Sequence, residues 1–169
     1  MKKTLIYLTM ILSLSACKEQ TEDNSAPLNQ ETLIEVSLPD SAYEQTFSYQ
    51  KDNLPTQCQS ENELVCSIEN VVKCALNPEL AYCDKQNMPE FLFYDDAMFA
   101  GDDIIGRPTE QSFQIRKIKP LTAHEIEVIT LGTCDNNWFG VCEGNIIYVM
   151  SNKTGSWLVD DVYAIETIK

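Results

Sequence analysis

The sequence predicts an α+β fold, in which N-terminal helices pack on a bent C-terminal antiparallel sheet of about four strands. Up to about residue 100, apolar residues recur at three- and four-residue steps, the spacing of helices with one buried face. After Gly101, apolar and polar residues alternate over short segments that turn-forming residues separate. Helices followed by consecutive strands are typical of α+β domains, and six cysteines after residue 30 indicate stabilisation by disulfides.

The helical half is predicted from capping patterns and apolar spacing. Residues 32–38 fit a short strand or the entry to a helix. The box Ser41-Ala42-Tyr43-Glu44 predicts a helix over 42–49, with Tyr43 and Phe47 as its buried stripe. A second box at 60–63 opens a better helix, which Asn77-Pro78 ends while starting another. The aromatic segment 88–99 predicts a further buried helix.

Four strands joined by short turns are predicted in the second half. The segment 152–155 has the composition of a hairpin turn, in which Gly155 supplies the positive φ. The strands are therefore expected to form an antiparallel meander. They cover residues 112–119, 124–131, 144–151 and 156–167.

The first seventeen residues have the layout of an export signal. Two lysines precede an apolar run over 5–14, too short to span a bilayer, and small residues lead to Cys17. The segment Leu14-Ser15-Ala16-Cys17 resembles the lipobox of bacterial lipoproteins. That resemblance implies cleavage before Cys17, a diacylglyceryl thioether on its sulfur and a further acyl chain, such as palmitate, on its amine. The alternative is an ordinary signal peptide with a chance cysteine.

Cleavage after residue 16 of the 169 would leave 153 residues, enough for one domain with its own core. Residues 17–30 are polar and would form a tether, and 31–169 would form a single α+β domain. In enterobacterial lipoproteins a residue other than Asp after the cysteine is associated with transfer to the outer membrane. Lys18 therefore implies, by resemblance, an outer-membrane anchor with the domain in the periplasm, in preference to the inner membrane.

The predicted mature chain is strongly acidic, with 10 basic against 26 acidic residues. This charge excludes nucleic acid as a partner and excludes electrostatic attraction to anionic lipid headgroups. The acyl chains of Cys17 alone would therefore attach the protein to the bilayer. The acidity fits either a solvated surface or a basic protein partner.

Six cysteines remain once Cys17 is assigned to lipid, and an even number in an exported chain predicts up to three disulfides. Closely spaced Cys and His ligands are missing, and the chain has a single His, which argues against zinc. We expect no cofactor. The six are Cys58, Cys66, Cys74, Cys83, Cys134 and Cys142.

Cys134 and Cys142 flank the loop between the second and third predicted strands, so a bridge between them would pin the strand ends. It would also fix Trp138 and Phe139, either as an exposed pair that contacts a partner or folded inward over the open end of the sheet. We favour the inward arrangement.

The other four cysteines allow three pairings. Cys66 and Cys74 would lie about 12 Å apart on one continuous helix, whereas a disulfide needs Cα atoms within about 7 Å. A bridge from Cys58 to the far end of that helix is also hard to form. The least strained pairing joins Cys58 to Cys66 and Cys74 to Cys83.

No hydrolase motif is present, and His124 begins a predicted strand without an obvious acid partner, which favours an exposed edge histidine. Strict alternation on the last strand places either Asp160 or Asp161 among apolar neighbours. Asp161 is then a candidate binding or acid–base residue, although a salt bridge with Arg107 or Arg116 is the more usual outcome.

Two further carboxylate pairs, Asp95-Asp96 and Asp102-Asp103, lack the spacing of an EF-hand loop. A loose calcium site there is an alternative to solvated carboxylates on a helix and in a turn.

The last predicted strand, which reads GSWLVDDVY from Gly155 to Tyr163, resembles the closing strand of the nuclear transport factor 2-like superfamily. The resemblance covers about residues 41–165 and implies a cone-shaped α+β fold. Its members include small lyases and isomerases with an Asp/His pocket as well as non-catalytic binding domains.

The expected location at the outer membrane and the acidic charge favour a non-enzymatic binding module, such as an inhibitor or immunity-type protein against a basic envelope-acting protein. The alternative is a small cone-fold lyase or isomerase that uses Asp161 and His124.

Overall fold

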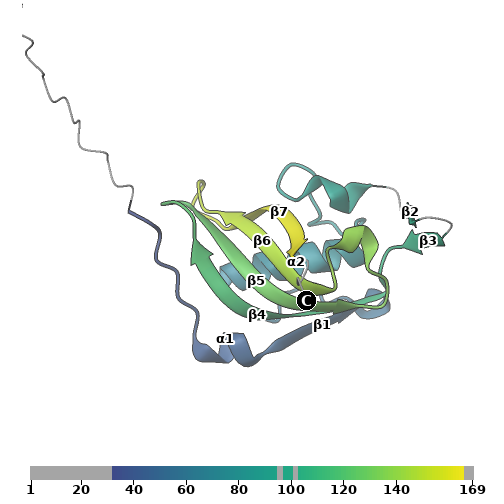
Figure 1. Ribbon diagram of the computed structural model, residues 1–169, viewed down its shortest axis with the longest axis horizontal. Helices are drawn as coiled ribbons and strands as arrows, with labels where there is room; N and C mark the ends of the chain where they lie inside the picture. Colours follow the sequence, from purple (N-terminus) through teal and green to yellow (C-terminus); the bar gives the residue numbers. More distant parts are fainter. Residues whose placement is uncertain (1–31, 95–96, 101–102, 166–169) are drawn as a thin grey trace, which may run out of the picture. The chain divides into compact units, whose positions relative to one another are not determined.

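The computed structural model describes residues 32–94, 97–100 and 103–165 (Figure 1). The chain divides into two units, residues 1–30 and Glu31–Lys169, and every described residue belongs to the second. Cys17, the polar segment 17–30, Asp95, Asp96 and Asp102 lie outside the described residues.

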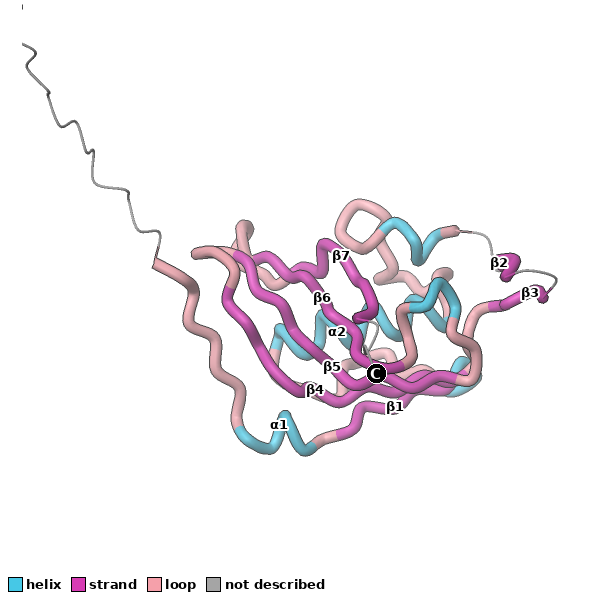
Figure 2. The backbone as a smooth tube through the Cα atoms, in the orientation of Figure 1, coloured by secondary structure: helices cyan, strands magenta, loops and turns pink. Residues whose placement is uncertain are grey.

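A five-stranded antiparallel sheet, in the order β1-β4-β5-β6-β7, forms the centre of the fold (Figures 1 and 2). The predicted meander is confirmed in its last four strands, and β1 adds a fifth strand beside β4. The five strands are β1 (Thr46–Gln50), β4 (Glu110–Pro120), β5 (Glu125–Cys134), β6 (Gly144–Ser151) and β7 (Leu158–Ile165). A separate two-stranded sheet pairs β2 (Ala97–Ala100) with β3 (Asp103–Gly106).

The helix predicted over 42–49 is wrong. A short helix α1 (Asp40–Glu44) ends at Gln45 and the chain continues as β1, while residues 32–39 form neither helix nor strand. In β1 the side chains of Phe47 and Tyr49 are buried and their neighbours exposed, and Phe47 stacks on Phe113 of β4 with ring centres 4.9 Å apart. Pairing with the long strand β4 buries both aromatic rings, which a helix would not place on one side.

The main helix, α2 (Glu63–Leu76), confirms the second predicted helix. Its N-cap is Asn62, whose side-chain oxygen accepts hydrogen bonds from the backbone of Leu64 and Val65, so the capping box expected at 60–63 does not form. The helix lies on one face of the sheet (Figure 1). Its buried apolar side chains are Leu64, Val65, Ile68, Val71, Val72, Ala75 and Leu76.

The two helices predicted after α2 are also wrong. The chain turns at Pro78 and the disulfide between Cys74 and Cys83 holds the turn against the helix end. Pro89 precedes a single 3₁₀ turn, η2 (Glu90–Phe93), and no α-helix follows in the described part of the chain. Proline removes a backbone donor, which limits helix propagation through this region.

Two irregularities bend the sheet and change which side chains face α2. The pairing register shifts at Arg116 in β4 and at Asp160 in β7, each strand carrying one residue more than its partner there.

Among the described residues, no helix is long and apolar enough to cross a membrane.

Candidate binding groove

The structure joins the six cysteines in the pairs expected from the sequence. Cα atoms are 5.4 Å apart in Cys58–Cys66, 5.8 Å in Cys74–Cys83 and 5.9 Å in Cys134–Cys142. Cys66 lies near the start of α2 and Cys74 near its end, so the first two bridges tie both ends of that helix to adjacent loops.

Trp138 and Phe139 fold inward rather than forming an exposed pair. Trp138 is 1% exposed and Phe139 half-buried, and their rings meet edge to face with centres 4.7 Å apart. They lie in a short 3₁₀ turn, η3 (Trp138–Gly140), inside the loop that the Cys134–Cys142 bridge closes. The preferred interpretation of the sequence is confirmed, and Trp138 is a core residue instead of a partner contact.

Arg107 was considered in the sequence as a partner for Asp161, but its described contacts lie in the interior. Its guanidinium donates to the carbonyl oxygens of Ala75, Leu92 and Tyr94 at 3.3, 2.9 and 2.8 Å. The guanidinium also covers the Trp138 ring. Arg107 therefore connects the end of α2, η2 and the disulfide loop.

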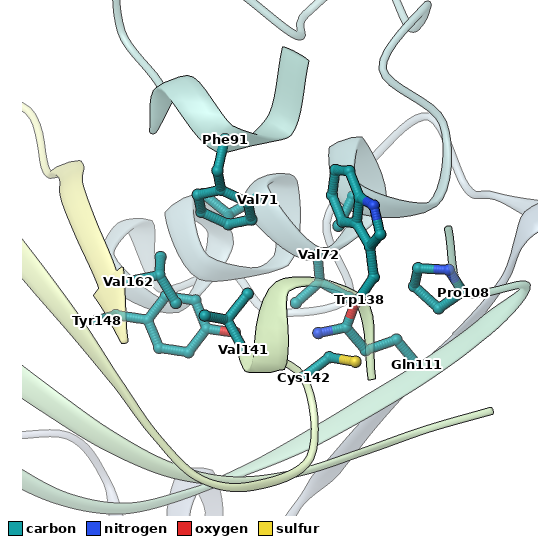
Figure 3. A pocket seen from close by; sticks show the side chains of 11 residues that line it. Val71, Val72, Phe91, Pro108, Gln111, Trp138, Val141, Cys142, Tyr148 and Val162 are labelled. Carbon is teal, nitrogen blue, oxygen red and sulfur yellow. The ribbon is translucent and has the colours of Figure 1, made fainter. Parts of the chain in front are cut away.

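A small interior pocket lies between α2 and the sheet (Figure 3). Figure 3 shows Phe91 of η2, Val71 and Val72 of α2, and Tyr148 and Val162 of the sheet converging on it. The cavity measures about 10 Å³, the size of one water molecule. Gln111 Oε1 and Trp138 Nε1, both on its lining, are buried with no hydrogen-bond partner among the described residues. Burial raises the pKa of Tyr148, which also lines the pocket, above its ordinary range.

The expectation that one aspartate of β7 is buried is wrong. Because of the bulge, Val159 and Val162 both face the core, and the two residues between them, Asp160 and Asp161, are exposed. Asp161 pairs with Val149 and its Oδ1 accepts a hydrogen bond from the backbone of Val162 at 2.8 Å. An extra residue in an edge strand thus resolves the conflict that strict alternation predicted.

His124 is exposed in the turn between β4 and β5, as the sequence favoured. Its backbone amide donates to Thr122 Oγ1 at 3.1 Å and its carbonyl accepts from Asn152. Neither His124 nor Asp161 lines the interior pocket, so the structure does not bring the two alternative catalytic residues together there.

A groove runs between the 81–88 loop and the beginning of β7, the edge strand of the sheet. It consists of two adjoining hollows of about 400 and 160 Å³, which share Leu158 and Val159 on one wall and Asn87 and Met88 on the other. Sequence reasoning missed this groove, because it expected a helix where the 81–88 loop lies. Its remaining lining residues are Ser67, Asn70, Val71, Ala81, Tyr82, Asp84, Gln86, Trp157 and Asp160.

Hydrogen bonds hold both walls of the groove in place. Ser67 Oγ of α2 donates to the carbonyl of Trp157 at 2.7 Å, and the Trp157 amide donates to Glu63 Oε1 at 3.3 Å. On the opposite wall Asp84 accepts from the Gln86 amide at 2.9 Å and from Asn87 Nδ2 at 2.6 Å. The loop is therefore fixed by its own side chains and by the Cys74–Cys83 bridge.

The groove is mixed in polarity and acidic. Asp84 and Asp160 are exposed carboxylates on opposite walls, whereas none of its lining residues is Lys or Arg. Met88 and Trp157, both partly buried, supply apolar surface between them. Such a lining suits an extended segment that carries positive charge and some apolar side chains.

A buried polar cluster lies behind the groove on the same helix. Glu69, fully buried on α2, accepts hydrogen bonds from the Tyr49 hydroxyl and from the backbone amides of Gln59 and Ser60. Burial, together with the hydrogen bond to Glu69, raises the pKa of Tyr49 far above its ordinary value. One helical turn away, burial lowers the pKa of Lys73, although the nearby charge of Glu69 opposes that change.

Sequence reasoning missed this cluster. The sequence pattern that could have revealed the cluster is a stripe of polar and cysteine residues at helical spacing on one side of α2. The stripe consists of Cys66, Glu69, Asn70 and Lys73. Two of the three donors to Glu69, the amides of Gln59 and Ser60, fix the 54–62 segment against the helix, and the third, the Tyr49 hydroxyl, ties the helix to β1.

No group of three or more potential metal ligands occurs among the described residues. No protein-family model, curated protein or solved structure matches this chain. The likenesses to bacterial lipoproteins and to the nuclear transport factor 2-like superfamily therefore stay predictions from the sequence.

Proposed function

We propose that this chain is a lipid-anchored module of the bacterial envelope that binds a basic segment of a partner protein. The observation that carries the proposal is the groove between the 81–88 loop and β7, with Asp84 and Asp160 on opposite walls and no basic lining residue. Opposite charge supports both the choice of partner and the rate of its association.

The anchor in this proposal is Cys17, acylated after cleavage of the export signal, with residues 17–30 as the tether and the outer membrane as the expected location. Three disulfides suit an oxidising compartment outside the cytoplasm. A module held at the membrane has a raised local concentration for partners that work there, which favours an inhibitory or immunity-type role.

The enzymatic alternative has less support. A small lyase or isomerase needs a cavity for its substrate with acid and base groups inside it, whereas the interior pocket holds about one water. Asp161 and His124, its candidate acid and base, are both exposed outside that pocket.

The binding proposal is tested with two groove carboxylates and two matched carboxylates elsewhere. The full chain, purified in detergent, is titrated calorimetrically with a twelve-residue peptide of alternating Lys and Leu and with its Glu-Leu counterpart. Asp84→Asn combined with Asp160→Asn should weaken binding of the basic peptide about tenfold, since each exposed pair contributes up to about 1 kcal/mol. Glu44→Gln combined with Asp52→Asn, which removes the same charge at exposed positions of α1 and the 51–53 turn, should change it less than twofold.

Equal weakening in both double variants would mean that net charge alone attracts the peptide, and the groove would be rejected as the site. Tight binding of the Glu-Leu peptide would rule out the proposal that the partner segment is positively charged. The anchor has a separate test, because Cys17→Ala should either release the domain from the membrane fraction or leave the chain unprocessed and without acyl chains. Unchanged acylation and fractionation would overturn the anchor without affecting the groove.

A further inference from the structure

A disulfide at the surface lies beside a buried ammonium group. Lys73 is 0% exposed, and its Nζ lies 4.0 Å from Cys58 Sγ, while Cys58 and Cys66 are both half-buried. Its other close neighbour is the ring of Tyr82, whose centre is 4.9 Å from Nζ. No carboxylate among the described residues forms an ion pair with Lys73 within 4.0 Å.

This arrangement leaves the oxidised protein with an unfavourable charge. A buried ammonium with no carboxylate in ion-pair contact keeps a desolvation cost that the charge of Glu69 and the π-face of Tyr82 repay only in part. Opening the disulfide would place a thiolate on Cys58, at the distance where Lys73 already lies. The reduced state would therefore gain an ion pair that the oxidised state lacks.

We infer that Cys58–Cys66 is a thiol–disulfide exchange site, in which Lys73 stabilises the thiolate of Cys58 and the co-reactant is a dithiol. A thiolate of the dithiol attacks Cys66 Sγ, the Cys58–Cys66 bond breaks, and its electron pair leaves on Cys58 Sγ beside Lys73. The second thiolate of the dithiol then displaces Cys66 from the mixed disulfide. The dithiol loses two electrons and becomes a disulfide, and the protein gains them as two cysteines.

The other two bridges differ from Cys58–Cys66 in the exposure of their cysteines and in the charge beside them. Cys74 and Cys142 are 0% and 3% exposed, so one sulfur of each bridge is shielded from an attacking thiolate. Among the described residues, Lys73 is the only Lys or Arg with a hydrogen-bonding contact to a disulfide sulfur. Cys58–Cys66 is thus the bridge in which both cysteines are partly exposed and an ammonium lies beside one sulfur.

The negative groups around this site are compensated. Glu69 lies on the same face of α2, but its carboxylate accepts from Tyr49, Gln59 and Ser60. The Tyr49 and Tyr82 hydroxyls keep their protons at neutral pH, since burial raises the pKa of both. Asn70 Nδ2 lies 3.8 Å from Cys66 Sγ, the sulfur that the dithiol attacks, while Asn70 Oδ1 lies 3.6 Å from Cys58 Sγ.

The first experiment measures which bond opens. The full chain is equilibrated at pH 7 with a series of reduced and oxidised glutathione mixtures, quenched by alkylation and mapped by mass spectrometry, which also separates Cys17. Cys58–Cys66 should open at a glutathione ratio at least tenfold less reducing than either other bridge. Lys73→Met, close in length but uncharged, should make it about tenfold harder to reduce, the equivalent of one unit in the pKa of the thiol.

A second experiment does not need the Lys73 variant to fold. Cys66→Ser leaves Cys58 as a free thiol, and the pH dependence of its alkylation by iodoacetamide gives its pKa. We expect a pKa below the ordinary value of about 8.5. The matched variant Cys142→Ser leaves Cys134 free and should give a value at or above it. Prior opening of another bridge, an unchanged equilibrium in Lys73→Met, or an ordinary pKa for Cys58 would each overturn the assignment.

Discussion

The guanidinium carbon of Arg107 lies 4.1 Å from the centre of the Trp138 indole ring, and both side chains are buried. Arg107 precedes β4 and Trp138 belongs to the loop between β5 and β6, so this contact joins two segments 31 positions apart in the printed sequence. The remaining donors of Arg107 reach the end of α2 and the η2 turn. One side chain therefore organises the end of the domain opposite the N-cap of α2.

Replacing this arginine should destabilise the domain markedly. Arg107→Met would leave three carbonyl oxygens short of a donor, two of them in buried hydrogen bonds and one in a part-buried hydrogen bond, so we expect a loss of about 2–4 kcal/mol in the free energy of unfolding. Urea unfolding followed by tryptophan fluorescence measures it. Arg116→Met, at the exposed bulge of β4, is the control and should change stability by no more than about 0.5 kcal/mol. Similar losses in both variants would contradict the role of Arg107.

The hydroxyl of Tyr49 should matter more than that of an exposed tyrosine. Tyr49→Phe removes one of the three donors to buried Glu69 and should cost about 1–3 kcal/mol of unfolding free energy. Tyr163→Phe removes a hydroxyl that donates to Glu127 at 3.0 Å on the exposed side of the sheet, and should cost less than about 0.5 kcal/mol. Chemical denaturation of the two variants at neutral pH compares them directly, and a larger loss for Tyr163→Phe would refute the ranking.

Lys73 should make the free energy of unfolding depend on pH in the alkaline range. Burial lowers its pKa in the folded chain, with Glu69 opposing, whereas the unfolded chain keeps the ordinary value of about 10.4. Between those two values the unfolded state binds more protons, so the free energy of unfolding rises with pH through that interval. The difference in stability between wild type and Lys73→Met should therefore shift in favour of the wild type from pH 7 to pH 9.5.

The check is a series of urea titrations without added thiol, with the exposed Lys117→Met as the control. For Lys117→Met the difference from wild type should stay constant with pH. A constant difference for Lys73→Met, or one that moves against the wild type, would show that the buried amine keeps its ordinary pKa.

Gly132 should be intolerant of a side chain. A Cβ at this position of β5 would lie 2.6 Å from the carbonyl oxygen of Cys142, a backbone atom that the Cys134–Cys142 bridge prevents from moving far. We expect Gly132→Ala to lower the melting temperature by more than 5 °C, as overpacking of about 1–3 kcal/mol does in domains of this size. Thr133→Ala, the exposed next residue, should lower it by less than 2 °C.

Sequence patterns predicted the meander and α2, because long periodic segments favour one element clearly. The segment that became β1 was ambiguous: Phe47 lies four residues after Tyr43 and two before Tyr49, so it fits both helical and strand spacing. The segment forms a strand because it pairs with β4, across separations of 60 (Gln50 with Glu110) to 68 residues (Thr46 with Gln114). No window of local sequence contains that information.

The site was harder to predict than the fold. The exposure of Asp160 and Asp161 depends on a bulge, and a one-residue change of register reverses every side chain beyond it. The acidic groove needs the 81–88 loop, which the Cys74–Cys83 bridge holds, and a helix was expected there. Lys73 looked like one more charged residue on α2, because its burial comes from segments distant in sequence.

The disulfides have one further consequence, for the order in which the chain can be oxidised. Each bridge joins a cysteine to the next one along the described chain, over separations of 8, 9 and 8 residues. A chain that crosses a membrane N-terminus first and meets an oxidant as it emerges would complete each native pair before the following pair appears. Such a protein acquires its native connectivity without a disulfide isomerase, and its refolding yield from the reduced, denatured state should be lower than its yield during export.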